Sequence, residues 1–470
     1  MLNSINPKRE MKKTNIYFVG IGGIGMSALA RYFIHEGWQV AGYDRTETPL
    51  TRRLEEEGAA VHYEDDVELI PTPFRDAERT VVVYTPAVPA DHSELRMFME
   101  GGFECLKRSQ MLGLLAEGKF VMAVAGTHGK TTTSTLAAWL NGRAAGEGCA
   151  FLGGISKNFG TNLTLGSGDR MVVEADEFDR SFLRLYPHVA VVTSVDADHL
   201  DIYGTYEAVK EAFSQFIDQI QKGGSLVMKL GVDVEVRNTE INLYRYSYDT
   251  PCDFYARNIS LLDGGYYRFD IVTPDTVIEN CTLGIPGWVN IENTVAAVAL
   301  FWCAARAEGK PMNADMLREA LAEFSGVKRR FEFYVNTPKQ VYMDDYAHHP
   351  RELSATITSV KRMLPGRRLT AVFQPHLYTR TRDLYVEFAE ALSEADEVVL
   401  LPIYPAREEP IEGICSEIIA ERVSVPCQIV EREALAQSLA EMETDVVVTF
   451  GAGNIDACCQ SVAEVLNRKA

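Results

Sequence analysis

The chain lacks the cysteine pattern of a disulfide framework and of a zinc site. Its nine cysteines are an odd number, and no two of them are spaced as C-x-x-C. This usage favours free thiols in a reducing compartment. The sequence also lacks an apolar run near the ~18 residues of a membrane span, and its first residues lack the apolar stretch of a signal peptide. We therefore expect a cytoplasmic protein with no membrane partner.

The chain also has fewer basic than acidic residues. Lys and Arg number 46 against 66 Asp and Glu, which gives 46 − 66 = −20. A chain with this balance repels nucleic acid and anionic membranes rather than binding them. If anionic substrates bind, local groups must overcome the overall charge. We predict small-molecule partners, no nucleic acid, and a monomer or a homodimer.

With 470 residues, the chain is long enough for about three domains. From Asn15 onward, short runs rich in Val and Ile alternate with helical patterns, which is typical of parallel α/β units. A helix-like segment before "FVMAVAG" sets one boundary near Lys119, and another follows "VKRRFEF". We predict an α/β fold of three domains. They are a Rossmann-like N-terminal half-fold (1–118), a central P-loop mononucleotide-binding α/β domain (119–333) and a C-terminal Rossmann-like α/β domain (334–470).

Two regions carry further strand signals. Residues 225–283 are less regular than the rest of the central domain and favour strands. In the last domain, "RRLTAVFQPH", "ADEVVLLPIY" and "TDVVVTFGAG" predict three strands separated by helices.

The first glycine loop (residues 20–25) matches a dinucleotide-binding pattern. Gly20, Gly22 and Gly25 form G-x-G-x-x-G between a predicted strand and a predicted helix, and Asp44 ends the next strand. The glycines permit a tight turn, and the N–H groups at the start of the helix face the phosphates. Too few residues separate Asp44 from the next domain for a two-halved Rossmann sheet with a hydride-transfer site. The loop therefore suits a diphosphate other than NAD in a half-sized fold.

A second glycine loop lies in "GTHGKTT", residues 126–132, after a strand and before a helix. Backbone N–H groups would wrap the β- and γ-phosphates of a nucleotide, Lys130 would neutralise them, and Thr131 would bind Mg²⁺. The pattern departs from G-x-x-x-x-G-K-[ST] because Val124 stands where the first glycine would be. The combination of strand, loop, Gly-Lys-Thr and helix still favours a nucleotide site over a chance glycine turn.

Acidic and imidazole groups follow two later strands, in "MVVEADEFDRSF" and "VVTSVDADHLDIYG". Ligands of α/β sheets bind at this edge. Glu174 and His199 are therefore candidate ligands or outer neighbours of Mg²⁺, which prefers oxygen and keeps several waters. For Asp176 and Asp201, helix capping is an equally good interpretation.

Eight segments together resemble one family, and they occur in order from about Ile16 to Ile455. They are "GIGGIGMSALA", "AGTHGKTTT", "EADEFDRSF", "DADHLD", "PGWVNIEN", "DDYAHHP", "FQPHLYTRT" and "GAGNI". The combination resembles the Mur ligases of peptidoglycan synthesis. The resemblance is greatest to the members that join L-alanine to UDP-N-acetylmuramate. It implies that the first domain holds the UDP part of the substrate, the central domain ATP, and the last domain the amino acid.

The resemblance also implies a reaction. ATP would phosphorylate the lactyl carboxylate of UDP-N-acetylmuramate, and the amine of L-alanine would attack the acyl phosphate to give an amide, ADP and phosphate. Phosphoryl transfer needs positioning and charge neutralisation more than covalent help, so ATP and Mg²⁺ are the expected cofactors. The implied setting is the cytoplasm, in cell wall biogenesis, cell shape and cell division.

The residues that the resemblance assigns fall into five sets. The UDP substrate would be bound by Gly20, Gly22, Gly23, Gly25 and Asp44. ATP would be bound by Gly126, Thr127, His128, Gly129, Lys130, Thr131, Thr132, Asn293, Arg329 and Asp345. The metal would be bound by Thr131, Glu174 and His199, and the amino acid by Tyr346, His348, His376 and Arg380. The catalytic residues would be Lys130, His199, His348 and Arg380.

Three assignments leave alternatives open. Val289 stands where the family commonly has a histidine, and the neighbouring Trp288 could stack on adenine or belong to the core. Arg380 could bind the alanine carboxylate through two parallel hydrogen bonds, or form only a surface salt bridge. Either His199 or His348 could take the proton that the alanine ammonium must lose, because imidazole titrates near neutral pH.

Four other functions share parts of this pattern. A recycling ligase of the same family, which adds a preformed tripeptide to the same UDP sugar, shares much of it. Folylpolyglutamate synthase has no place for the G-x-G-x-x-G domain. An NAD-dependent dehydrogenase would leave "GTHGKTT" unused, and a non-catalytic nucleotide sensor would leave the candidate metal ligands and Arg380 without a role.

Overall fold

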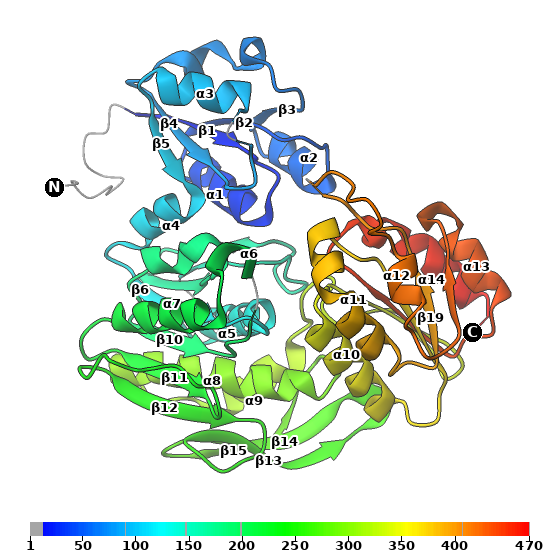
Figure 1. Ribbon diagram of the computed structural model, residues 1–470. Coiled ribbons are helices and arrows are strands. Elements are labelled where there is room, and N and C mark those ends of the chain that lie inside the picture. The colour runs from blue at the N-terminus through cyan, green and yellow to red at the C-terminus, as the bar shows by residue number, and fades with distance from the viewer. Residues whose placement is uncertain (1–12, 90, 146–147, 198–199, 407, 470) are drawn as a thin grey trace. The chain divides into compact units, whose positions relative to one another are not determined.

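The computed structural model describes residues 13–89, 91–145, 148–197, 200–406 and 408–469. They form three β-sheets with helices packed against them (Figure 1). The chain divides into two compact units. The first unit runs to Ala256 and adds Ile271–Ile278 and Asn293–Ala320, and the second comprises Arg257–Asp270, Glu279–Glu292 and Leu321–Ala470. No helix among the described residues is both long enough and apolar enough to cross a bilayer.

The first sheet has five parallel strands in the order β3-β2-β1-β4-β5. Its strands are β1 (Asn15–Val19), β2 (Gln39–Tyr43), β3 (Ala60–His62), β4 (Thr80–Tyr84) and β5 (Glu104–Lys107). The central strand β1 is buried along its whole length, as expected where helices cover both faces of a parallel sheet. The sheet carries two strands more than a three-stranded mononucleotide-binding half.

Helices cover the two faces of this sheet unequally. One face packs against α1 (Ile24–His35), α2 (Pro49–Glu56) and α4 (Arg108–Ala116). The other packs against α3 (Ser93–Glu100) and the 3-10 turns η1 (Val67–Leu69) and η2 (Thr72–Arg75). Alternation along β1 explains this, since Ile16 and Phe18 point to one face and Tyr17 and Val19 to the other.

A buried carboxyl group lies on the α3 face of the first sheet. Glu94 is 0% exposed, and its Oε2 accepts a hydrogen bond of 2.6 Å from the Tyr17 hydroxyl. His62 Nε2 lies 2.8 Å from the same hydroxyl oxygen and 3.3 Å from Glu94 Oε1. Burial raises the pKa of Glu94 from 4.5 to about 7, and Asp65 adds to the rise. Because burial lowers the pKa of His62, this imidazole does not supply a compensating charge at neutral pH.

We expect Glu94→Gln to stabilise the protein above pH 7. The folded pKa of Glu94 lies above its unfolded value, so the stability that Glu94 contributes is complete below about pH 4.5 and is lost as the pH rises through about 7. The glutamine removes this loss while it keeps an acceptor for Tyr17. At pH 8 the free energy of unfolding should rise by about 2 kcal/mol, measured by urea denaturation. The gain should shrink toward zero near pH 4.5, and an equal difference at both pH values would contradict the assignment.

The second sheet has ten strands in the order β15-β14-β13-β12-β11-β10-β6-β9-β7-β8. Its strands are β6 (Phe120–Ala125), β7 (Cys149–Phe151), β8 (Leu163–Thr164), β9 (Arg170–Glu174), β10 (Val189–Val192), β11 (Ser225–Lys229), β12 (Asn242–Ser247), β13 (Phe254–Leu261), β14 (Tyr267–Val272) and β15 (Val277–Thr282). Its helices are α5 (Lys130–Ala145), α6 (Leu200–Tyr203), α7 (Tyr206–Asp218), α8 (Val289–Ala307) and α9 (Ala314–Glu323), with 3-10 turns η3 (Phe178–Arg184) and η4 (Asp263–Gly265). The prediction that residues 225–283 favour strands is confirmed by β11 to β15.

The third sheet has six strands in the order β16-β17-β21-β18-β19-β20. Its strands are β16 (Glu332–Asn336), β17 (Val341–Asp345), β18 (Leu369–Phe373), β19 (Glu397–Leu400), β20 (Cys427–Ile429) and β21 (Val446–Phe450). Only β16 runs antiparallel to its neighbour among the pairs that the structure describes in this sheet. The three strands predicted here are confirmed as β18, β19 and β21.

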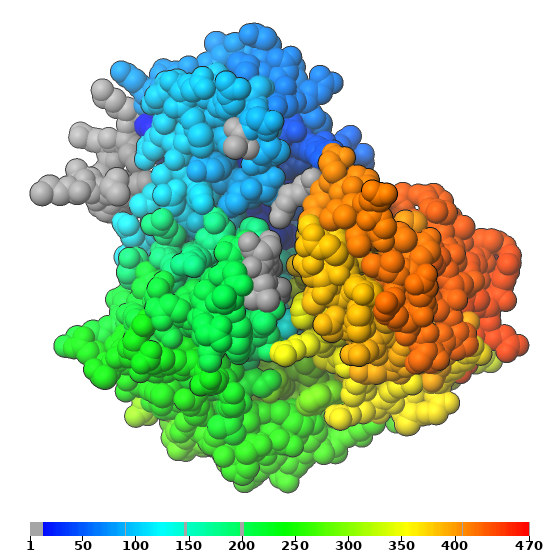
Figure 2. All heavy atoms as spheres, viewed as in Figure 1, coloured from blue at the N-terminus to red at the C-terminus, as the bar shows by residue number. Residues whose placement is uncertain are grey.

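Helices form a layer on each face of the third sheet. One layer consists of α10 (Pro350–Met363), α11 (Tyr378–Leu392) and α12 (Glu417–Ala420). The other consists of α13 (Leu435–Glu441) and α14 (Cys459–Asn467), with 3-10 turns η5 (Arg432–Ala434) and η6 (Asn454–Cys458) nearby. In the space-filling view, the side chains of the yellow and orange helices close the spaces that the ribbon leaves open, and they hide the sheet behind them (Figure 2).

Candidate functional site

The first glycine loop joins β1 to the start of α1. The N–H groups of Gly20 and Ile21 donate to the Tyr43 carbonyl at 2.8 and 2.9 Å, so the chain turns tightly against β2. Gly20 has φ +91°, a conformation that favours glycine. Gly23 precedes α1, whose first turn has no acidic residue. The loop therefore leaves the positive end of the α1 dipole without a negative side chain from its own first turn.

Asp44 places a carboxylate against this loop, although it lies outside α1. Its Oδ2 accepts the Gly22 N–H at 2.7 Å, and its Oδ1 accepts the Thr46 N–H at 3.3 Å. A side chain on Gly22 would bring its Cβ within 2.8 Å of that carboxylate. The structure thus brings Asp44 and the glycines together, as predicted, and it gives Asp44 a role in shaping the loop.

The second glycine loop (residues 126–129) joins β6 to α5. Gly126 has φ +136° and Gly129 has φ +79°, and a Cβ on Gly126 would collide with the Thr193 hydroxyl. Thr127 N–H donates to the Ser194 carbonyl at 3.0 Å, so the loop is held against the end of β10. Val124 is fully buried inside β6. The departure from the common glycine pattern is explained, because the loop begins only at Gly126.

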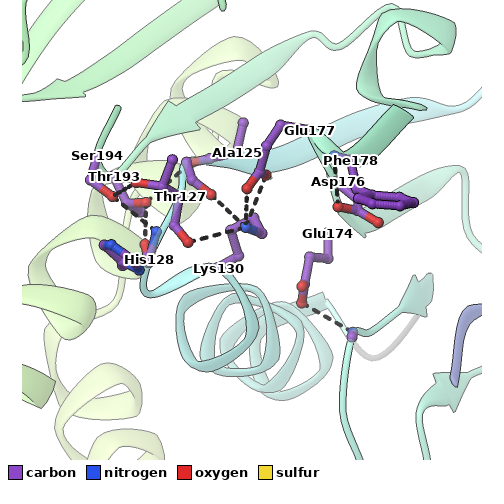
Figure 3. A network of polar contacts seen from close by, with 12 residues as sticks. Ala125, Thr127, His128, Lys130, Glu174, Asp176, Glu177, Phe178, Thr193 and Ser194 are labelled. Atoms are coloured by element: carbon purple, nitrogen blue, oxygen red, sulfur yellow. Dashed lines mark hydrogen bonds and ion pairs between the residues drawn. The ribbon is translucent and has the colours of Figure 1, made fainter. Parts of the chain in front are cut away.

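Lys130 is held inside this loop by an ion pair (Figure 3). Its Nζ lies 2.9 Å from each oxygen of Glu177 and donates to the Gly126 carbonyl at 2.6 Å. The two side chains are 14% and 2% exposed. Burial alone would lower the pKa of Lys130, but three carboxylates, first that of Glu177, hold it above its ordinary value. The ammonium is therefore charged and already aimed at the loop in which it would meet phosphate.

Glu174 lies at the end of β9, beside the start of α5 (Figure 3). Its Oε1 accepts the Thr131 hydroxyl at 3.1 Å, and its Oε2 accepts the Gly153 N–H at 3.1 Å. The Thr131 hydroxyl oxygen and Glu174 Oε1 are thus close enough to bind one metal ion, and Mg²⁺ prefers oxygen ligands. His199, the third predicted ligand, lies outside the described residues. Among the described residues, no group of three His, Cys, Asp or Glu side chains could hold a metal ion by itself.

Asn293 lies in α8, next to the second glycine loop. Its Oδ1 accepts the Thr133 hydroxyl at 3.4 Å, and a Cβ on Gly129 would come within 2.8 Å of the same atom. His128 belongs to the same region, since its Nε2 lies 3.3 Å from Asp196 Oδ2. The structure therefore brings together the described ATP residues predicted in the first unit.

Helix α1, which follows the first glycine loop, is hydrogen-bonded to the segment before β8 within the first unit. Asn162, next to β8, donates to the Ile24 carbonyl at 2.5 Å and to the Ser27 hydroxyl at 3.1 Å. Both partners lie in the first turn of α1. Arg31 of α1 donates to the side chains of Asn162 and Thr161. Since Asn162 and Arg31 are buried, these bonds are shielded from competing water.

The second unit holds the other predicted nucleotide residues. The guanidinium of Arg329 donates to Asp344 Oδ2 at 3.1 Å and to the carbonyls of Gly451 and Gly453 at 2.6 and 3.2 Å. Asp345 accepts the backbone N–H groups of Phe331 and Ala347 at 2.8 and 2.9 Å. Burial raises the pKa of Asp345 to about 6. Both side chains hold the turns at the ends of β17 and β21 in place.

The predicted amino-acid residues gather at the same strand ends. The guanidinium of Arg329 lies 5.2 Å from the Tyr346 ring centre. The His348 ring lies 5.4 Å from Tyr346 and 6.3 Å from His376, which stacks on Tyr404 at 5.8 Å. His348 Nδ1 is 3.0 Å from the Tyr346 carbonyl, which can only accept, so Nδ1 carries the proton and Nε2 is the acceptor.

The protonation state of His348 follows from its surroundings. Burial lowers its pKa to about 4, and the positive charge of Arg380 adds to this effect against the opposing carboxylate of Glu352. The imidazole is therefore neutral at pH 7. Arg380 itself lies in the first turn of α11, and no hydrogen bond or ion pair joins it to any residue that the structure describes. The interpretation of Arg380 as one half of a surface salt bridge has no support in the described part of the chain.

Several residues of these sites have no distinct signal in the sequence. Glu177, Thr193 and Ser194 stand in segments that follow strands, where the sequence pattern points to their neighbours instead. Tyr404, which stacks on His376, had no signal of its own. Trp288 is half-buried, and the guanidinium of Arg362 lies 5.0 Å from its ring centre, so one face of the indole is occupied within the second unit.

Comparisons with known proteins agree over nearly the whole chain. Three family models match it in order. These are the Mur ligase family catalytic domain over residues 15–120, the Mur ligase middle domain over 124–301 and the Mur ligase glutamate ligase domain over 329–453. The UDP-N-acetylmuramate–L-alanine ligase of Parabacteroides distasonis is 49% identical over 97% of this chain and 98% of its own length. The corresponding ligase of Phocaeicola vulgatus is 48% identical, with the same coverage.

Solved structures give the same pattern of similarity. The UDP-N-acetylmuramate–alanine ligase of Thermotoga maritima has a TM-score of 0.79 and 26% identity, with 97% of this chain and 100% of that chain covered. The murein peptide ligase of Psychrobacter arcticus has a TM-score of 0.69 and 23% identity, with 96% and 98% covered. The second likeness shows a shared fold only.

Proposed function

Because the chain belongs to the Mur ligase family, we propose that it is an ATP-dependent ligase that joins L-alanine to the lactyl carboxylate of UDP-N-acetylmuramate in peptidoglycan synthesis. The observation that carries the proposal is the pair of glycine loops at helix starts within one compact unit. The second loop adds a charged lysine and a carboxylate beside a threonine. Two anionic substrates, a sugar nucleotide and a triphosphate, account for both loops.

The first step would transfer the γ-phosphoryl group of ATP to a carboxylate oxygen of the sugar nucleotide, with ADP as the leaving group. The charge of three phosphates and a carboxylate opposes this approach. Lys130 would exchange its partner Glu177 for phosphate oxygens, and the backbone N–H groups of the loop would orient the triphosphate. The product is an acyl phosphate, whose phosphate is a far better leaving group than the oxide of a carboxylate.

The second step would form the amide. The amine of L-alanine attacks the acyl carbon, loses a proton, and phosphate departs. Arg380 would bind the alanine carboxylate with two parallel N–H···O bonds and so aim the amine, since its guanidinium has no partner among the described residues. His348, neutral and with Nε2 as an acceptor, is the described candidate for the proton. His199 remains the other candidate that the sequence offers.

Mg²⁺ fits the first unit. Thr131 and Glu174 bring two oxygens within 3.1 Å of each other beside the second glycine loop. With His199 as a third ligand, these residues would hold the ion, and the rest of its shell would be water and phosphate oxygen. When bound, the ion neutralises charge on the transferring phosphoryl group.

Each substrate would bind in one of the three domains. The UDP substrate would occupy residues 1–118, ATP residues 119–333 and the amino acid residues 334–470. Arg329 and Asp345 would bind ATP, and Tyr346 and His376 would line the amino-acid site. A cytoplasmic place in cell wall biogenesis, cell shape and cell division follows from this reaction.

The experiment compares acceptors. Purified protein is mixed with ATP, Mg²⁺ and UDP-N-acetylmuramate, and phosphate release is measured with L-alanine, with glycine or serine, and with a preformed tripeptide. We expect release with L-alanine, and a product heavier by one alanine residue in mass spectrometry. Release with the tripeptide alone would support the recycling ligase instead, and ATP use without any acceptor-dependent product would contradict both.

A further inference from the structure

Arg108, the first residue of α4, lies against the first glycine loop. A Cβ built on Gly25 would come within 2.9 Å of Arg108 Nη1 and 3.0 Å of its Cδ. The guanidinium therefore lies directly on the last glycine of the G-x-G-x-x-G pattern. Its side chain is 20% exposed, and its one hydrogen-bond partner among the described residues is Asp176, whose Oδ2 lies 3.1 Å from Nη2.

This placement suits an anionic ligand. A helix start carries partial positive charge and favours acidic side chains. The first turns of both α1 and α4 contain no acidic residue, and Lys107 directly precedes Arg108 at the start of α4. A guanidinium has five N–H donors, of which Arg108 uses one. The loop therefore combines two helix starts and a cation that has spare donors.

Asp176 is the acidic partner of Arg108. It follows Glu174 by two residues after β9, so it belongs to the segment that also carries the candidate metal ligand (Figure 3). Arg108, Glu174, Asp176 and Phe182 line a cavity of about 10 Å³, which is room for about one water molecule. A phosphate is too large for this cavity, so an anion that binds Arg108 on this side must displace Asp176.

We propose that Arg108 binds the diphosphate of the sugar nucleotide on the first glycine loop, and that Asp176 holds its guanidinium in place until the diphosphate displaces it. The inference rests on the proposed function and names a substrate-binding residue that the sequence motifs did not include. The guanidinium fork matches two phosphate oxygens, while the backbone N–H groups of the loop bind the others. The diphosphate is chosen over the lactyl carboxylate because Arg108 lies on Gly25, inside the diphosphate loop.

The test measures binding of UDP-N-acetylmuramate, UDP and uridine by calorimetry, without ATP. Arg108→Ala should lower the affinity for UDP-N-acetylmuramate and for UDP by about 10- to 100-fold, as expected for lost hydrogen bonds to a charged group. The affinity for uridine should be unchanged. The affinity of Arg108→Lys for UDP should lie between those of Arg108→Ala and the unchanged protein. Asp176→Asn should strengthen UDP binding by roughly two- to five-fold, because it removes a competing partially exposed ion pair.

Lys107→Ala is the matched control. Lys107 is the neighbour of Arg108, and it forms an equivalent ion pair with Asp179 at 2.8 Å. Its removal should leave UDP affinity within about two-fold, since it lacks the contact with Gly25. If both alanine variants weakened UDP binding equally, the proposal would be overturned. Lys107 and Arg108 would then have only a structural role, through their ion pairs. Weaker binding of UDP-N-acetylmuramate with unchanged UDP binding would also overturn it, since the lactyl carboxylate would then be the ligand.

The outcomes separate this inference from the proposed function. If the unchanged protein fails to bind UDP-N-acetylmuramate, the proposed function is wrong. If it binds the sugar nucleotide and Arg108→Ala binds it equally well, only the role of Arg108 is wrong. Melting temperature and ATP affinity of Arg108→Ala and Lys107→Ala, both expected to match the unchanged protein, show that the fold is retained.

Discussion

Replacing Lys130 with methionine should lower kcat/KM for ATP by about 10³-fold or more, because the phosphates then lose the nearest positive charge in a water-poor loop. The single substitution also leaves Glu177, 2% exposed, without its counter-charge. A buried carboxylate that loses its partner costs about 3–5 kcal/mol of stability. Lys130→Met alone could therefore fail for structural reasons.

The double variant Lys130→Met with Glu177→Gln separates the two effects. It removes both charges, so its free energy of unfolding should lie within about 1–2 kcal/mol of that of the unchanged protein. It should remain as inactive as the single variant. Lys210→Ala, which removes a lysine paired with Asp233 at the surface, is the control and should keep full activity. A stable double variant that turns over ATP at a normal rate would refute the role of Lys130.

Replacing Arg380 with alanine should raise the KM for L-alanine by about 100-fold, which is the value of a bidentate charged hydrogen bond that is lost. Binding of ATP and of the sugar nucleotide should be unchanged, because no contact of Arg380 is assigned to them. Arg380→Lys should recover part of the loss, since it keeps the charge without the fork. The measurement is steady-state phosphate release over a range of L-alanine concentrations.

Arg382 provides the control for this experiment. It lies two residues further along α11 and pairs with Asp383 at 2.7 Å on the surface. Arg382→Ala removes an arginine from the same helix without touching the proposed site, so the KM for L-alanine should stay within about two-fold. Equal effects of the two substitutions would indicate a general disturbance of α11. A normal KM in Arg380→Ala would place the carboxylate elsewhere.

The elements that the sequence predicted well are those with strong local signals. The strands β18, β19 and β21 read as apolar runs because they are buried on both faces, and both glycine loops stand between a strand and a helix, as predicted. The α/β class follows from this alternation. Glycine at positive φ is a further local requirement, which explains why Gly20 and Gly126 could be identified without coordinates.

The parts that the sequence did not reveal depend on contacts between distant residues. Glu177 reads as one acid among several after β9, and only the folded chain places it on Lys130. Asp44 was predicted to touch substrate, but its contact with the Gly22 N–H requires the return of β2 beside β1. Arg108 has no motif of its own, because its significance comes from lying on Gly25. The spacing of residues along the chain does not predict such tertiary contacts.

The hydrogen bonds between α1 and the segment before β8 have a consequence for the rigidity of the first unit. Asn162 donates to the first turn of α1, and Arg31 of α1 donates back to Asn162. Because these groups are buried, pulling α1 away from this segment would leave polar atoms without partners in the interior. We therefore expect α1 and the edge of the second sheet to move as one body.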